Sequence, residues 1–197
     1  MSDQKFIIPH NFSIKKEDRE KLNGHKGKLI WFTGISGSGK STLAGMLEFV
    51  LHEKGMHTYI LDGDNVRSGL NKDLDFTDEG RVENIRRIAE VAKLFVDAGI
   101  IVMASFISPF RSERAFAREL VGKENFIEVF VDCNLETAEQ RDVKGLYKKA
   151  RAGIIPNFTG ISSPYERPEN PDVIVNSSTG SKDESLAKII AGVTPRL

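Results

Sequence analysis

The sequence predicts an α/β fold in which helices cover both faces of a mostly parallel β-sheet. Short apolar segments alternate with longer segments whose apolar residues recur at helical spacing, which is the pattern of consecutive βαβ units. Glycines follow two of the helical segments, at Gly55 and Gly99, where helices commonly end in the left-handed conformation. A glycine-rich loop joins the first apolar segment to the first helical one. The 197 residues are enough for one domain of this kind.

The order of the elements follows from these patterns. Residues 1–26 are polar and are expected to form an N-terminal arm with a short solvated helix, ahead of a single domain at residues 27–197. Apolar runs of strand length place the strands at residues 29–33, 57–61, 100–106, 126–131 and 173–175. Helical spacing places helices at residues 42–54, 84–98, 112–120 and 135–141, and Ser112 is expected to cap the third of these. A capping box at residues 181–184 begins a last helix. Glycines and prolines interrupt regular structure in residues 142–171.

Composition and charge exclude several classes of function. Lys and Arg number 28 and Asp and Glu number 28, so the chain lacks the positive charge of a general nucleic-acid binder. The most apolar run, residues 100–107, is far shorter than the roughly 20 residues that a membrane-spanning helix needs. Cys133 has no partner for a disulfide, the first residues do not resemble a secretion signal, and the four histidines are scattered. We therefore expect a cytoplasmic protein without nucleic-acid, membrane or cage-type metal binding.

The loop at residues 34–41 carries the first chemical signal. It matches G-x-x-x-x-G-K-[ST] and lies between a strand and a helix, as a phosphate-binding loop requires. In such a loop Lys40 reaches the β and γ phosphates of ATP and Ser41 offers its hydroxyl to Mg²⁺. The expected nucleotide-binding residues are Gly34, Ile35, Ser36, Gly37, Ser38, Gly39, Lys40, Ser41 and Thr42. The motif refines the fold class to the three-layer P-loop nucleoside triphosphate hydrolase type.

The loop alone leaves GTPase switches, motor-type ATPases and small-molecule kinases open. A guanine-reading Asn-Lys-x-Asp motif is absent, since residues 71–74 begin the pattern but place Leu74 where the carboxylate should stand. The absence of this motif weakens the interpretation of the chain as a GTPase switch.

Polar residues that could hold an acceptor follow the second and third strands. Asp62, Asp64 and Arg67 come at the carboxyl end of the second strand, where ligands bind in such sheets, although Asp-Gly-Asp-Asn is also a good turn sequence. Asp62 is our candidate for ordering the water bound to Mg²⁺ and for accepting the proton of an attacking hydroxyl. Arg81 and Asn84 are chosen because basic residues at a helix start oppose the helix dipole unless a ligand uses them or they simply face water.

Together, five segments resemble the adenylylsulfate kinase family, and the likeness covers most of residues 28–176. They are residues 34–41, 61–70, 83–87, 105–111 and 142–160. The resemblance implies that ATP, with Mg²⁺, phosphorylates the 3′-hydroxyl of adenosine 5′-phosphosulfate to give 3′-phosphoadenosine 5′-phosphosulfate. Two alternatives stay open, another small-molecule P-loop kinase and an ATP-binding module without turnover.

The resemblance also implies roles for individual residues. Asp64, Arg67, Arg81 and Asn84 would hold the acceptor, Phe76 and Phe158 would sandwich its adenine, and Ile107 and Lys144 would complete the pocket. Ser108 matches the serine that can be phosphorylated in this family, but in-line transfer needs no covalent intermediate, so we favour direct transfer. The expected catalytic residues are Lys40, Asp62 and Ser108, and the expected metal ligands are Ser41 and Asp62. Residues 142–160, which follow Arg141 in a basic run, are interpreted as a lid.

Three positions differ from the usual family pattern. Gly80 stands where aspartate is common, Asp75 where glycine is common, and Ser162 where aspartate is common. They flank the acceptor residues and could change how rigidly that loop is held. The resemblance further suggests a homodimer with the N-terminal arm as a contact. It also suggests ATP sulfurylase as a separate pathway enzyme, since no second domain is visible.

Overall fold

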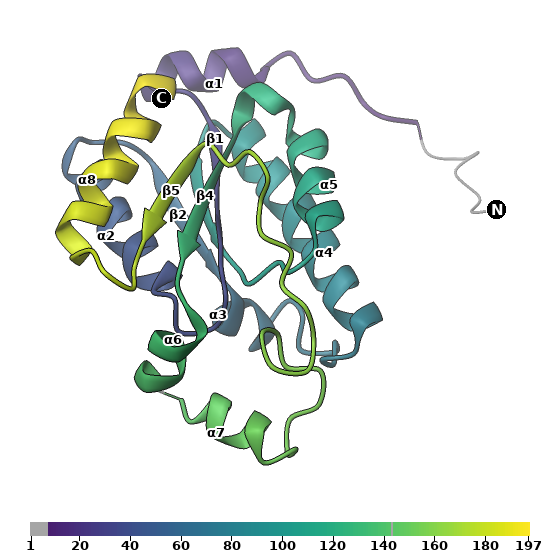
Figure 1. The fold of residues 1–197 in the computed structure, drawn as a ribbon. Coiled ribbons are helices and arrows are strands. Elements are labelled where there is room, and N and C mark those ends of the chain that lie inside the picture. The colour runs from purple at the N-terminus through teal and green to yellow at the C-terminus, as the bar shows by residue number, and fades with distance from the viewer. Residues whose placement is uncertain (1–7, 143) are drawn as a thin grey trace.

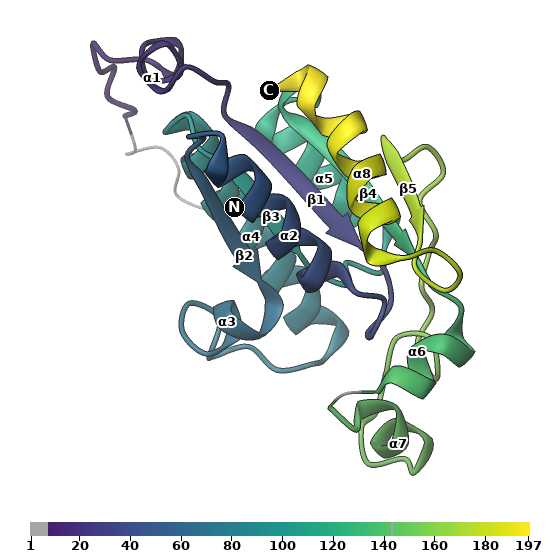
Figure 2. The same ribbon diagram turned by 90° about the vertical axis from the view of Figure 1, so that its left-hand side faces the viewer.

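The computed structural model describes residues 8–142 and 144–197, and in them the chain forms a five-stranded parallel sheet (Figures 1 and 2). The strand order is β2-β3-β1-β4-β5. The strands are β1 Lys28–Thr33, β2 Thr58–Asp62, β3 Ile101–Ser105, β4 Phe126–Asp132 and β5 Val173–Asn176. The predicted fold class is confirmed, and each strand lies within about one residue of its expected position.

Helices separate consecutive strands. The α-helices are α1 Lys16–Asn23, α2 Lys40–Glu53, α3 Gly63–Arg67, α4 Asp78–Asp97, α5 Arg111–Val121, α6 Leu135–Arg141, α7 Leu146–Arg151 and α8 Lys182–Val193. Short 3₁₀ turns occur at η2 Lys123–Asn125 and η3 Thr194–Arg196. None of the helices described is both long and apolar enough to cross a lipid bilayer.

Strand β1 shows how the two faces of the sheet are covered. Its side chains alternate, so that Leu29 and Trp31 pack in the apolar cluster with α4 and α5. Ile30 and Phe32 pack in the cluster with α2 and α8 on the other face (Figure 2). All six residues of β1 are buried, as expected for the central strand of a sheet covered on both sides.

Two helix starts differ from the prediction. Helix α4 begins at Asp78 rather than at residue 84, because the Thr77 hydroxyl accepts a hydrogen bond from Gly80 N at 3.1 Å and caps it. Arg81 therefore lies at the end of the first turn and Asn84 one turn further in, so the premise that these residues begin the helix was wrong. Helix α5 begins at Arg111, so Ser112 lies inside it instead of capping it.

Short helices also occur where none was expected. Helix α3 spans five residues after β2, and α7 spans six residues within the segment predicted to be irregular. Both are shorter than two turns, so their apolar residues cannot establish a helical period. In Figures 1 and 2, α3, α6 and α7 lie at the carboxyl end of the strands, while α1 and the C-terminus lie at the opposite end.

Candidate functional site

The phosphate loop connects β1 to α2 and closely approaches neighbouring backbone. Gly34 has φ +154°, and a Cβ there would lie 2.5 Å from the carbonyl oxygen of Val131. Gly39, the residue before α2, has φ +95° in the left-handed region. Glycine is required at both positions for steric reasons, and the turn they permit directs backbone N–H groups and the start of α2 toward one point.

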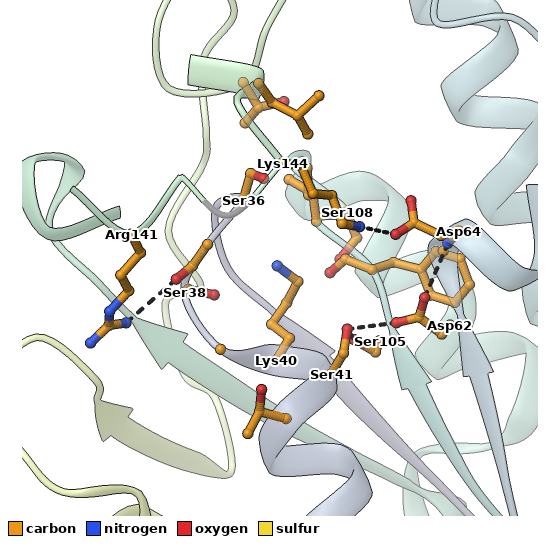
Figure 3. Close-up of a pocket in the computed structure, with 18 of the residues that line it drawn as sticks. Ser36, Ser38, Lys40, Ser41, Asp62, Asp64, Ser105, Ser108, Arg141 and Lys144 are labelled. Carbon is orange, nitrogen blue, oxygen red and sulfur yellow. Dashed lines mark hydrogen bonds and ion pairs between the residues drawn. The ribbon is translucent and has the colours of Figure 1, made fainter. Parts of the chain in front are cut away.

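Lys40 is the buried cation of this loop. Its Nζ donates to the carbonyl oxygen of Ile35 at 2.9 Å and, in Figure 3, points toward the centre of the cavity between Ser38 and Asp62. Burial lowers the pKa of Lys40 to about 8, although the nearby Asp62 carboxylate acts in the opposite direction. A phosphate group entering the loop would give this poorly solvated ammonium a strong partner.

Oxygen atoms suited to a magnesium ion meet beside the loop. The hydroxyl of Ser41 donates to Asp62 Oδ2 at 2.6 Å and lies 3.1 Å from the hydroxyl of Ser105. The second oxygen of Asp62 accepts from Asp64 N at 3.1 Å, which fixes the orientation of the carboxylate. No cluster of three acidic, histidine or cysteine ligands occurs in residues 8–142 or 144–197. A donor set this small fits Mg²⁺ held mainly by substrate phosphates and water.

The predicted acceptor residues come from α3 and α4. Asp64 and Arg67 lie on α3, and Arg81 and Asn84 lie on α4. Arg81 donates to the carbonyl oxygen of Asn157 at 2.5 Å, so the acceptor side is joined to the far end of the lid segment.

Asn71 is a residue that the sequence analysis did not recognise as part of this site. It is fully buried, and its Nδ2 donates to Asn84 Oδ1 at 3.0 Å. This hydrogen bond occupies the amide oxygen of Asn84 and leaves its amide N–H groups for a ligand. The signal in the sequence was weak, because buried and exposed asparagines look alike there.

The predicted lid, residues 142–160, contains α7. The Tyr147 hydroxyl on α7 donates to the carbonyl oxygen of Ser36 at 2.8 Å, so the lid contacts the phosphate loop directly. Lys144 forms an ion pair with Asp64 across the cavity (Figure 3). The lid thus contacts both the donor loop and the acceptor side, joining them in one enclosure.

The two predicted stacking aromatics differ in environment. Phe158 is buried with its ring edge against Tyr147, the ring centres lying 5.0 Å apart. Phe76 is 64% exposed, and the Arg67 guanidinium lies over its ring at 4.4 Å. Both rings line the same cavity. Whether an adenine is held between them stays a prediction.

Ser108 lies in a strained turn after β3, and its hydroxyl points into the core. Its φ is +40°, it is 2% exposed, and its Oγ accepts a hydrogen bond from Trp31 Nε1 at 2.9 Å. The same hydroxyl donates to Thr33 Oγ1 at 3.1 Å. The hydroxyl is thus engaged by two side chains of β1. We therefore regard Ser108 as a residue that holds the turn, and its role as a nucleophile stays an untested prediction.

A single cavity of about 680 Å³ collects almost all of the predicted residues. Of these, only Gly34 and Ile35 do not line it: Gly34 approaches the backbone of Val131, and Ile35 packs in the apolar cluster under the lid. The cavity is also lined by residues that were not predicted, among them Ser105, Arg141, Tyr147, Thr159, Ser177, Gly180, Ser181 and Lys182. Arg141 lies across the cavity from Asp64, with Lys40 between them (Figure 3). The basic residues around Arg141 in the sequence were the available signal that this residue could belong to the site. Residues 177–182 showed only the start of a helix cap in the sequence.

Comparisons with known proteins identify the family of the chain. Residues 26–176 match the family model described as adenylylsulphate kinase. A probable adenylyl-sulfate kinase of Halalkalibacterium halodurans is 56% identical, over 96% of this chain and 94% of that protein. The adenylyl-sulfate kinase of Citrobacter koseri is 60% identical over 85% of this chain and 83% of its own length.

Among solved structures, the Mycobacterium tuberculosis APS kinase in complex with AMPPNP and APS superimposes with a TM-score of 0.82. It is 49% identical, and the match covers 86% of this chain and 98% of that one. The phosphate loop, the acceptor residues around it and these likenesses lead to one conclusion: the chain belongs to the adenylylsulfate kinase family.

Proposed function

We propose that this chain transfers the γ-phosphoryl group of ATP to the 3′-hydroxyl of adenosine 5′-phosphosulfate. The products would be 3′-phosphoadenosine 5′-phosphosulfate and ADP. The observation that carries the proposal is the shared cavity, in which the donor lysine Lys40 and the acceptor residues of α3 and α4 line one space. A structural relative with the same fold was solved with both an ATP analogue and APS, which supports two nucleotide sites.

On the donor side, the phosphate loop would bind the triphosphate through backbone N–H groups and Lys40. The base of ATP would then extend toward Arg141 and the loop at residues 177–182, which line the cavity on that side. Arg141 is held there because its guanidinium donates to the carbonyl oxygens of Ser177, at 2.5 Å, and Gly37, at 3.4 Å. A planar cation fixed in this way can stack on a purine.

Ser41 and Asp62 would hold Mg²⁺, which when bound offsets the negative charge on the transferring phosphoryl group. The Ser41 and Asp62 oxygens already lie 2.6 Å apart, so little rearrangement is needed to present both. Mg²⁺ is part of the proposal because the donor set fits it.

On the acceptor side, Arg67, Arg81 and the amide of Asn84 supply donors for an anionic nucleotide. The acceptor oxygen would attack the γ phosphorus in line with the departing β–γ bridging oxygen. A phosphorus–oxygen bond to the acceptor forms, the bond to ADP breaks, and the hydroxyl proton passes to the Asp62 carboxylate. Transfer of this kind needs positioning and charge stabilisation and no phosphoenzyme.

The lid would exclude water during transfer, so that the phosphoryl group reaches the acceptor instead of water. Its contacts with Ser36 and Asp64 span the cavity from donor to acceptor side. Location in the cytoplasm, a homodimer and a separate ATP sulfurylase that supplies the acceptor are further parts of the proposal. The homodimer and the separate sulfurylase rest on the resemblance to the family, and the location rests on the single cysteine and the first residues of the sequence.

The decisive experiment compares acceptors. We expect Mg²⁺-dependent ADP release when adenosine 5′-phosphosulfate is added to the protein and ATP, and much less with AMP, which lacks the sulfate. The Lys40→Ala variant is the matched control and should lose turnover by orders of magnitude, because it removes a buried charge from the phosphates.

Other outcomes would contradict the proposal. Equal ADP release with AMP would favour a kinase of different specificity. Saturable nucleotide binding with no ADP above background would favour a binding module without turnover.

A further inference from the structure

The loop between α3 and α4 contains a carboxylate that organises its neighbours. Asp75 Oδ1 accepts hydrogen bonds from Thr77 N at 3.0 Å and from Thr77 Oγ1 at 2.5 Å. The Thr77 hydroxyl in turn accepts from Gly80 N at 3.1 Å and caps α4. Asp75 therefore orients the capping hydroxyl and satisfies the backbone N–H of the capping residue.

Gly80 provides the space that this carboxylate occupies. A Cβ at Gly80 would lie 2.4 Å from Asp75 Oδ1, 2.8 Å from the Asp75 carbonyl oxygen and 3.2 Å from Thr77 Oγ1. Gly80 lies inside a regular helix and does not have a positive φ, so its backbone does not require glycine. The glycine is needed for space, and Asp75 and Gly80 form a matched pair.

The same loop holds the groups that face the acceptor. Arg67 Nη1 donates to the carbonyl oxygens of Leu74 and Asp75, each at 3.1 Å, and its guanidinium lies over the Phe76 ring. On the other side of the cap, Arg81 directly follows Gly80 and Asn84 lies one turn further on. One residue, Asp75, thus bonds to Arg67 through its main chain and fixes the start of the helix that carries Arg81.

We propose that Asp75 is a positioning residue for the acceptor site, acting together with the space left by Gly80. In an ordinary capping box, an acidic side chain at the third helical position accepts from the N–H of the capping residue. Gly80 occupies that third position in α4 and cannot do this, so Asp75 supplies the acceptor oxygen from the loop instead. The inference rests on the proposed function, because its main consequence is the affinity for the acceptor nucleotide.

An exchange of the two residues tests the pairing. Asp75→Gly should raise the KM for adenosine 5′-phosphosulfate by roughly threefold to tenfold, since the cap and the Arg67 contact loosen together. Gly80→Asp should also raise it, because the new side chain collides with the Asp75 carboxylate and repels it. The double variant places a carboxylate at the third helical position and should restore the KM to within about twofold of the parent. Such a result is non-additive, as expected for coupled residues.

Controls separate positioning from general damage. The KM for ATP should change by less than about twofold in all variants, because the phosphate loop does not contact this segment. Asp75→Asn keeps an acceptor oxygen and should remain close to the parent. Asp78→Asn removes a charge from the same turn of α4 and should leave the acceptor KM unchanged.

Amide hydrogen exchange at Thr77, which is present in all the variants, reports on the cap without any turnover. It should speed up in Asp75→Gly and slow again in the double variant. The inference would be overturned if the increases in acceptor KM of the two single variants simply multiplied in the double variant. An unchanged acceptor KM in Asp75→Gly would also overturn it. A parent protein that does not release ADP with this acceptor would instead refute the proposed function, while the exchange data would still test the pairing.

Discussion

Ser108 shows how a single residue can carry a family signal and a different local role. Its hydroxyl bonds to Trp31 on β1 and to Thr33, so it joins the turn after β3 to the central strand. Thr33 Oγ1 in turn donates to the carbonyl oxygen of Ile107 at 2.7 Å. The backbone of the turn is thereby fixed from two directions, and Ile107 is presented to the cavity.

We expect Ser108→Ala to lower the free energy of unfolding by about 1–3 kcal/mol while keeping substantial turnover. The substitution leaves the buried indole N–H of Trp31 without an acceptor, and an unpaired buried donor costs about this much. Denaturant unfolding and steady-state ADP release measure the two effects. Ser112→Ala, which changes an exposed serine on the next helix, is the matched control and should change neither.

Complete loss of turnover in the folded Ser108→Ala variant, with acceptor binding intact, would point to an obligatory phosphoserine. In that case the hydroxyl would have to leave its bond to Trp31 during the reaction.

At the same scale, the phosphate loop could be predicted residue by residue because its chemistry is local in sequence. Asn71 could not be identified, because its importance comes from its contact with Asn84 on another element. Tyr147 and Ser36 are likewise joined only by the fold. Contacts between distant segments require coordinates, so the roles of such residues do not follow from spacing.

At the scale of elements, the strands were predictable because glycines and polar residues bound their apolar runs. The start of α4 was not, since the usual signal of an acid at the third helical position is missing at Gly80. Asp75 supplies that oxygen from outside the helix, where a pattern of helix capping does not look for it. The short helices α3 and α7 were missed because they have too few residues to show a period.

Helix α5 contains a buried acid that makes stability depend on pH. Glu113 is 5% exposed and its Oε1 lacks a hydrogen-bond partner, while Oε2 accepts from Phe110 N at 3.3 Å. Burial raises the pKa of Glu113 from 4.5 to about 7, although the nearby positive charges of Arg114 and Arg81 oppose the shift and Glu166 adds to it. The folded protein therefore favours the protonated form of this side chain.

The direction of this pH dependence follows from the difference between the pKa values of Glu113 in the folded and unfolded states. Below pH 4.5 the acid is protonated in both states and costs nothing. Between pH 4.5 and about 7 the unfolded chain releases its proton while the folded protein keeps it, so stability falls as pH rises. Above pH 7 the folded protein carries the full free-energy cost of burying the charged carboxylate.

We expect Glu113→Gln to stabilise the protein by about 1–3 kcal/mol at pH 8 and hardly at all at pH 4.5. Chemical denaturation at the two pH values measures the difference. Glu119→Gln, on the exposed side of the same helix, is the control. An equal gain from Glu113→Gln at both pH values would show that packing rather than ionisation is responsible.

At the scale of the whole molecule, the lid contacts the body through polar contacts at the site, through an ion pair between Arg151 and Glu139 of α6, and through a small apolar cluster around Tyr147. Lys144 pairs with Asp64, Tyr147 bonds to Ser36, and Arg81 bonds to the segment after α7 at Asn157. Figure 2 shows α6 and α7 projecting beyond the end of the sheet. Such a region opens more easily than the core, and ligands on both sides of it should add contacts that hold it closed.

We therefore expect amide exchange across residues 144–160 to slow several-fold when an ATP analogue and the acceptor are both bound. Mass-spectrometric hydrogen exchange measures this, with β1 and β3 as slowly exchanging references. Helix α1, at the opposite end of the molecule, should show no change (Figure 1). Protection that spreads equally to α1 would argue for global stabilisation instead of lid closure.

The bond between Trp31 and Ser108 has one more consequence. Trp31 is the only tryptophan of the chain, it is fully buried, and its ring stacks between Phe106 and Phe126. The intrinsic tryptophan fluorescence of the protein therefore comes from one indole whose N–H is bonded to the turn beside the acceptor. We expect a change in the hydrogen bond at this turn to shift that emission, which would make Trp31 an optical reporter of the turn that lines the proposed acceptor site.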